Sequence, residues 1–250
     1  MKIRFLGTHN IGAGQANPAG VLIDDIVALD AGCLSSLNTT EQLNLRAVLL
    51  THQHYDHLRD LPMLGMNLHL HEASIEVYGL PEVQEVITKH LLNDVLYPNF
   101  LAGPAMDYRP ITPEKLFQVE DYRVIPIEVK HSVPAVGYEI ASGTRRIFYS
   151  GDTGPGLSNS WKHLEPDLII IEVTASNCWV EFGRKSGHLT PALLAEELMT
   201  FNSLKGYTPQ VYTVHTNPHL QDIIQAELAE VSQALNCSIA MAQEGLEIVF

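Results

Sequence analysis

The sequence is poor in basic residues. Only 15 Lys and Arg residues stand against 29 Asp and Glu residues, which gives a formal net charge of −14. A surface of this average sign repels polyanions, so we expect no extended contact with DNA or tRNA. A small anionic substrate is compatible with this charge if metal ions hold it.

The sequence also lacks a cysteine framework and a long apolar run. Cys33, Cys178 and Cys237 are odd in number and form no Cys-x-x-Cys pair, which argues against a disulfide scaffold or a cysteine zinc site. The longest strongly apolar stretch, around 168–171, is far below the roughly 18 to 20 residues that span a bilayer. The amino terminus shows no signal-peptide pattern. We therefore expect a cytoplasmic protein with reduced thiols and no membrane partner.

Short strand-like runs and amphipathic helices are what the sequence does contain. The strand patterns cover 3–6, 21–23, 26–29, 47–50, 122–129, 136–140, 146–149, 168–171 and 211–214. The helical patterns cover 81–92, a segment from 190 onward and 218–235. Two batches of strands, each followed by helices, predict an α/β (α+β) protein with a four-layer αββα sandwich. We expect one domain over residues 1–250, and 99–112 is the segment that best fits a long surface loop.

The strongest local signal is the segment Thr51-His-Gln-His-Tyr-Asp-His57, which directly follows a strand-like run. A loop that leaves a buried strand can direct His52 and His54 to one metal ion. Asp56 and His57 can then turn to a second ion as the chain enters a helix. Imidazole and carboxylate ligands suit zinc, manganese or iron.

This segment resembles the H-x-H-x-D-H signature of the metallo-β-lactamase superfamily. The resemblance implies three further ligands in a fixed order, each at the end of a strand. His131, Asp152 and His215 stand in that order, each after a strand-like run. By this resemblance His52, His54 and His131 hold one ion, whereas Asp56, His57 and His215 hold the other, with Asp152 between them. Two divalent ions, zinc or manganese with iron as an option, would then supply a bridging hydroxide and polarise phosphoryl oxygens.

A second candidate cluster joins Glu172 to His188, which lies in the segment Gly187-His-Leu-Thr-Pro191. A histidine oriented by a carboxylate can act as a general acid for a poor alkoxide leaving group. The alternative is that His188 caps the helix that starts at Thr190. We count Asp56, Glu172 and His188 as the candidate catalytic residues, with Asp56 also a ligand.

Two branches of the superfamily carry similar elements, namely the class II cyclic-nucleotide phosphodiesterases and the tRNase Z enzymes. Segments that resemble the first branch are His90-Leu-Leu-Asn93 with Tyr97-Pro-Asn-Phe100, Gly151-Asp-Thr-Gly154 and Gly187 to Pro191. The residues after Glu172 depart from that branch. Against tRNase Z, the sequence has no Gly/Pro- and Lys-rich insertion that could form a tRNA-gripping arm.

We therefore expect a metal-dependent hydrolase that cleaves a small phosphodiester, with a 3′,5′-cyclic nucleotide as the first choice of substrate. The alternatives are a tRNase Z-like nuclease, a lactonase, a thioesterase or a β-lactamase on the same fold, and a metal-dependent sensor without turnover. A homodimer is possible. The remaining histidines have structural or surface interpretations, although the first is expected to border the pocket: His9, His69, His71, His163 and His219.

Overall fold

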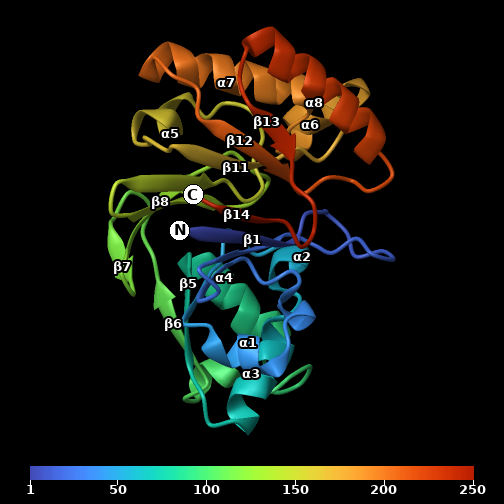
Figure 1. Cartoon of the computed structure of the whole chain (residues 1–250). Coiled ribbons are helices and arrows are strands. Elements are labelled where there is room, and N and C mark those ends of the chain that lie inside the picture. The colour runs from blue at the N-terminus through green and yellow to red at the C-terminus, as the bar shows by residue number, and fades with distance from the viewer.

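The computed structural model describes residues 1–250 and contains two sheets of seven strands each (Figure 1). The first sheet has the strand order β14-β1-β2-β3-β4-β5-β6. Its strands are β1 Lys2–Gly7, β2 Gly20–Ile23, β3 Val27–Leu29, β4 Ala47–Leu49, β5 Ile75–Gly79, β6 Met106–Pro110 and β14 Glu247–Val249. The last strand therefore returns from the end of the chain to pair with the first.

The second sheet has the order β13-β12-β11-β10-β9-β8-β7. Its strands are β7 Phe117–Val119, β8 Tyr122–Glu128, β9 Val136–Ser142, β10 Arg145–Tyr149, β11 Leu168–Glu172, β12 Gln210–Val214 and β13 Ile239–Met241. Strands β7 to β10 pair antiparallel, whereas β10 to β13 pair parallel. Parallel neighbours end at the same edge of a sheet, which brings the loops after β10, β11 and β12 together.

Helices cover the two outer faces of the sheets (Figure 1). On the first sheet these are η1 Leu34–Ser36, α1 Thr39–Asn44, α2 Tyr55–Leu58, α3 Leu61–Leu70, α4 Pro81–Val86, η2 Ile87–Leu91 and η3 Phe100–Ala102. On the second sheet they are α5 Ser158–Lys162, η4 Asn177–Trp179, α6 Val180–Ser186, α7 Pro191–Lys205 and α8 Gln221–Leu235. The predicted αββα sandwich is confirmed. No helix combines the length and the apolar character needed to cross a membrane.

The core is divided by the second sheet into a large and a small part. A cluster of 45 buried residues joins the two sheets and the helices of the first half. A second cluster of 16 buried residues lies between the second sheet and α5, α7 and α8, with Trp161 and Phe201 at its centre. Burial of apolar area on both faces of the second sheet explains why β11, Leu-Ile-Ile-Ile-Glu, is buried at every position.

Several elements differ from the expectation. No predicted run covers β5, β7, β13, β14, α1 or α3. The segment 99–112 is not a long loop, because it contains η3 and the edge strand β6. In β6, Met106 and Tyr108 are buried between exposed neighbours, and Pro110 is tolerated at the end of an edge strand. The predicted helix 81–92 is confirmed in its first part, but its second part, η2, has the wider π-helical turn.

Candidate metal centre

The predicted site residues lie on loops that leave strands at one edge of the sandwich. His52 and His54 follow β4, and Asp56 and His57 are in α2, which begins directly afterwards. The second sheet supplies the rest: His131 after β8, Asp152 after β10 and His215 after β12. Both sheets therefore contribute to one site.

The side chains form two groups that share Asp152. Ligand atoms of His52, His54, His131 and Asp152 all lie within 4.8 Å of one another. The same holds for Asp56, His57, His215 and Asp152. We call His52, His54 and His131 the first ligand group, and Asp56, His57 and His215 the second ligand group. The structure thus brings together all seven residues, in the two sets that the sequence predicted.

The distances between these atoms fit a shared cation. His54 Nδ1 lies 3.1 Å from His131 Nε2, and His215 Nε2 lies 3.2 Å from Asp56 Oδ2. Asp152 Oδ1 lies 3.2 Å from His57 Nε2. Ligands about 2.0 to 2.1 Å from a tetrahedral zinc ion are roughly 3.3 Å from each other.

Several of these atoms lack any other partner, which tests whether the residues fit metal ions. His52 Nε2, His57 Nε2 and Asp152 Oδ1 are buried and make no hydrogen bond. Although Asp152 Oδ1 is close to His57 Nε2, the contact does not have hydrogen-bond geometry. Because buried polar atoms almost always have a partner, convergent atoms without one fit divalent cations.

The protein holds the opposite edge of four of the five imidazoles, namely those of His52, His57, His131 and His215. Thr174 Oγ1 donates to Glu172 Oε2 at 2.7 Å, so at 2.8 Å it accepts from His215 Nδ1. His215 Nε2 then presents its lone pair to the cluster.

The same logic applies on the other side of the site. Thr51 Oγ1 donates to Asp30 and accepts from His52 Nδ1 at 3.0 Å. Asp30 Oδ2 also accepts from His57 Nδ1 at 2.7 Å, and the Gly187 carbonyl accepts from His131 Nδ1 at 2.8 Å. Each contact fixes the tautomer that leaves Nε2 free for a cation.

The two ligand groups differ in charge. Burial lowers the pKa of His52 well below its usual range, and burial also lowers the pKa of His54 and of His131. In the second group, burial opposes the charged form of His57, but Asp152 and Asp30 outweigh it and raise the pKa of His57 well above its usual range. The first group therefore offers neutral imidazoles, whereas the second is embedded among carboxylates.

Special backbone conformations make the close approach possible. Gly151 has φ +57°, and a Cβ there would lie 2.6 Å from the Thr51 side chain, so a glycine lets Asp152 approach both groups. His215 itself has φ 61° and Asp30 has φ 60°, which is uncommon for residues other than glycine. Such conformations cluster at functional sites.

Glu172 and His188 form the predicted pair beside the second ligand group. His188 Nδ1 donates to Glu172 Oε1 at 2.6 Å. Glu172 is fully buried, and its oxygens also accept from the backbone N–H groups of Thr153 and Leu189. Its carboxylate is therefore occupied by hydrogen bonds and positions His188. Ligand atoms of Glu172 and His188 also lie within 4.8 Å of those of Asp152 and His215, so these four residues form a third group of possible metal ligands.

This pairing controls the charge of His188. Burial lowers the pKa of His188, but the Glu172 carboxylate outweighs burial and raises the pKa to about 9. Cations bound in the adjacent groups would bring this value down again. The helix cap, the alternative role for His188, is supplied by Thr190, whose side chain accepts from the Leu193 N–H at the start of α7. His188 is thus available to donate a proton.

A cavity of about 440 Å³ adjoins this pair. Its wall includes His188 and Thr174, and also the exposed aromatic side chains of Trp179 and Phe182. The expectation that His9 borders the pocket is wrong. The His9 imidazole is held by Glu244 and Gln221, and its neighbour Asn10 lines the cavity instead.

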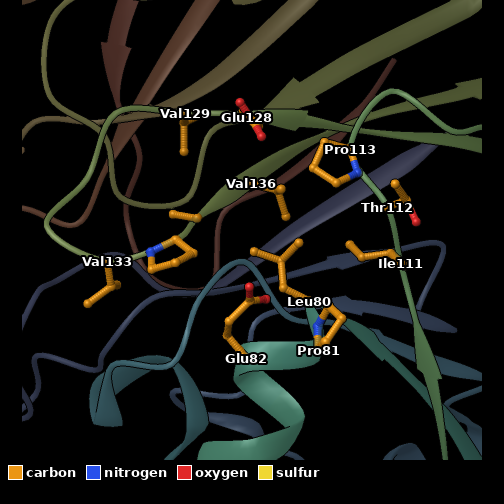
Figure 2. A pocket seen from close by; sticks show the side chains of 12 residues that line it. Leu80, Pro81, Glu82, Ile111, Thr112, Pro113, Glu128, Val129, Val133 and Val136 are labelled. Carbon is orange, nitrogen blue, oxygen red and sulfur yellow. The ribbon is translucent and has the colours of Figure 1, made fainter.

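Figure 2 shows another cavity of about 420 Å³, between the start of α4 and the loop before β9. Glu82 and Glu128 lie on its wall, together with apolar residues such as Leu80 and Val136. None of the seven clustered residues lines it. Its carboxylates would repel an anion, whereas no Asp or Glu lines the cavity beside His188.

Some residues of the site were not predicted from the sequence. Asp30 is fully buried and accepts from Thr51, His57 and Tyr149. Its only sequence signal is a carboxylate followed by Ala-Gly at the end of a strand-like run. Thr174 and Trp179 have no signal of this kind, because their role depends on loops that meet only in the folded chain.

Comparison with known proteins gives a family match over residues 25–216, to the family described as beta-lactamase superfamily domain. Ribonuclease Z of Pyrococcus abyssi is 33% identical over 108 residues, which cover 42% of this chain and 33% of that protein. The 3′,5′-cyclic-nucleotide phosphodiesterase 1 of Saccharomyces cerevisiae is 22% identical over 188 residues, which cover 62% of this chain and 50% of that protein. The chain thus spans half or less of the length of these two relatives.

Solved structures share the whole fold. Unliganded yeast PDE1 has a TM-score of 0.84 at 18% sequence identity, and the alignment covers 100% of this chain and 99% of that chain. The short form of human tRNase Z has a TM-score of 0.74 at 18% identity, with coverage of 100% and 99%. At this identity the likeness concerns the fold alone. The family and fold predicted from the sequence are confirmed.

Proposed function

The chain belongs to the beta-lactamase superfamily, and from that premise we propose that it is a dinuclear, metal-dependent phosphodiesterase that hydrolyses a small phosphodiester. The expected substrate is a 3′,5′-cyclic nucleotide. Two divalent ions, zinc or manganese with iron as an option, would activate water and polarise the phosphoryl oxygens. The proposed ligands are the two groups and the shared carboxylate: His52, His54, His131, Asp56, His57, His215 and Asp152.

The observation that carries this proposal is the Glu172–His188 pair beside the ligand groups. Because Glu172 holds His188 Nδ1, the other imidazole nitrogen is free to face a bound substrate. When water attacks phosphorus, the bond to the sugar oxygen breaks and leaves an alkoxide. In this proposal His188 gives that oxygen its proton. Hydrolysis of a lactone or β-lactam depends less on such a proton donor. Asp56 acts by holding a cation rather than by moving a proton.

The charge of the protein supports a small substrate. With a formal net charge of −14, binding of a long polyanion would lack the usual drive from counterion release. The similarity to ribonuclease Z favours a second candidate function, which is endonucleolytic cleavage of precursor tRNA. The two candidates share the chemistry at phosphorus and differ in the surface that holds the rest of the substrate.

We also propose that residues 1–250 act as one domain. The pairing of β14 with β1 supports this, because the last strand completes the sheet that the first strand begins.

A turnover panel with manganese- or zinc-loaded protein tests the function. The substrates are cyclic AMP, cyclic GMP, a 2′,3′-cyclic nucleotide, a precursor tRNA, a lactone and a β-lactam. We expect cleavage of a cyclic nucleotide and little processing of precursor tRNA. Processing of precursor tRNA at rates that match the small substrates would favour the second candidate, and turnover of only the lactone or β-lactam would reject both.

A further inference from the structure

Resting on the proposed function, we propose that the cavity beside His188 binds the heteroaromatic base of the substrate against Trp179 and Phe182. These two residues are then determinants of substrate specificity rather than members of the metal centre. They come from η4 and from the first turn of α6, which form one wall of the cavity.

The exposure of this aromatic pair is the first observation. Trp179 and Phe182 are both 52% exposed, whereas the other tryptophan, Trp161, is fully buried. Their ring centroids lie 6.2 Å apart with an interplanar angle of 79°. Large aromatic side chains that stay exposed beside a catalytic pair provide a surface on which a base can stack.

The wall that carries Trp179 is anchored to two helices. The Asn177 N–H donates to Glu227 of α8 at 2.8 Å, and the Asn177 side-chain oxygen accepts from the Ala192 N–H at the start of α7 at 2.7 Å. Because η4 is tied at both contacts, the backbone that carries Trp179 is positioned before a ligand arrives. Such preorganisation reduces the entropy lost on binding.

The electrostatic character of the cavity suits an uncharged ring. No Asp, Glu, Lys or Arg lines it, although the protein carries 29 acidic residues. The polar groups that line it belong to residues such as Asn10, Asn217 and His219, which can donate or accept hydrogen bonds at the edge of a base. The cavity in Figure 2 differs in this respect, because Glu82 and Glu128 lie on its wall.

The position of the cavity sets the orientation of the substrate. His188 lies both on its wall and within 4.8 Å of Asp152 and His215. A phosphodiester at the ligand groups therefore has its sugar oxygen near His188 and its base in the cavity. A volume of about 440 Å³ is within the usual range for small-molecule sites.

The first test compares a cyclic nucleotide with ribose 3′,5′-cyclic phosphate, which has the same reacting group but no base. Trp179→Ala should raise KM for the nucleotide roughly tenfold, equal to about 1.4 kcal/mol, with little change in kcat. Hydrolysis of the abasic substrate should be unchanged. Trp179→Phe keeps a ring and should retain most of the affinity, and Leu204→Ala, an exposed apolar residue on α7, is the matched control.

The second test measures binding without turnover. A nucleoside 5′-monophosphate should quench the fluorescence of exposed Trp179, whereas ribose 5-phosphate should not, and Trp179→Phe should abolish the signal. Equal effects of Trp179→Ala on both cyclic substrates, or no base-dependent quenching, would overturn the inference. Base-dependent quenching without hydrolysis of any cyclic nucleotide would support this subsite while rejecting the proposed function. Hydrolysis without any dependence on the base would do the reverse.

Discussion

The two ligand groups contain similar side chains, yet they are supported in different ways. In the first group, a hydroxyl group backs His52 and a backbone carbonyl backs His131. In the second group, the Asp30 carboxylate backs His57 directly, and Asp56 adds its own negative charge. The second group should therefore hold a cation more tightly, because negative charge near a cation stabilises it.

The proposed proton donor lies near both ligand groups. The Glu172–His188 pair adjoins the second group, through Thr174, which contacts both Glu172 and His215. His188 also lies close to the first group, because its ring centroid is 5.0 Å from that of His131 and 5.6 Å from that of His215. The neutral imidazoles of the first group should permit easier exchange of a bound ion than the second group does.

The largest expected effect comes from removing the residue that both groups share. Asp152→Ala should lose both ions and reduce activity by more than the about 10⁴-fold that a single general acid contributes. Elemental analysis together with turnover checks this. Asp107→Ala, an exposed carboxylate on β6, is the control and should change neither. A fully metallated, active Asp152→Ala protein would show that Asp152 is not the ligand that the two groups share.

His188→Ala should have the next largest effect, and only on substrates with poor leaving groups. We expect a loss of about 10² to 10⁴-fold on a cyclic nucleotide and a much smaller loss on bis-(p-nitrophenyl) phosphate, because p-nitrophenolate departs without a proton. Metal content should be unchanged. Equal losses on both substrates would assign His188 to binding or structure.

Glu172→Gln gives a milder form of the same test. The amide keeps the size of the side chain and one acceptor oxygen for His188, but it no longer favours the protonated form of His188. Its NH2 group also cannot accept from Thr174 and Leu189 as the carboxylate does. Activity on the cyclic nucleotide should again fall more than activity on bis-(p-nitrophenyl) phosphate, but by less than in His188→Ala. A loss on bis-(p-nitrophenyl) phosphate as large as that on the cyclic nucleotide would show that Glu172 supports the fold instead.

Asp30→Asn tests the support of the second group. Replacing a partner behind a metal-binding imidazole typically reduces metal affinity by about 10- to 100-fold. The affinity for the ion at His57 should fall more than the affinity for the ion in the first group, because Asp30 reaches His52 only through the Thr51 hydroxyl. A titration with a competing chelator measures both affinities. An equal loss of affinity at both groups would mean that Asp30 supports both groups to the same extent.

The smallest effect concerns the unmodified protein. Stepwise chelation should release the ion of the first group at roughly tenfold lower chelator concentration than the ion of the second, because fewer carboxylates surround the first. Metal content at each step can be followed by elemental analysis, and Asp56→Asn should narrow the gap. Release of both ions in one step would contradict the ranking.

Strand periodicity, which is a local pattern, located nine of the strands. The spacing within 51–57 marked four of the clustered residues, whereas His131, Asp152 and His215 followed from the resemblance to the superfamily. Edge strand β6 was missed, since Pro104 and Pro110 suggested a loop while only Met106 and Tyr108 show the alternation. Asp30, Thr174 and Trp179 were missed for another reason. Their positions depend on contacts between distant segments, such as Asp30 with His57, Thr174 with His215 and Asn177, beside Trp179, with Glu227, which no local pattern records.

The unusual backbone of His215 and Asp30, together with the unpaired atoms of His52, His57 and Asp152, has a thermodynamic consequence. Each is unfavourable for the folded chain by itself, so the site weakens the fold that builds it. Ions that bind only the folded state reverse this loss by mass action. Each ion at 100 times its Kd should add about 2.7 kcal/mol to the free energy of unfolding. The melting temperature should therefore depend on the concentration of free metal.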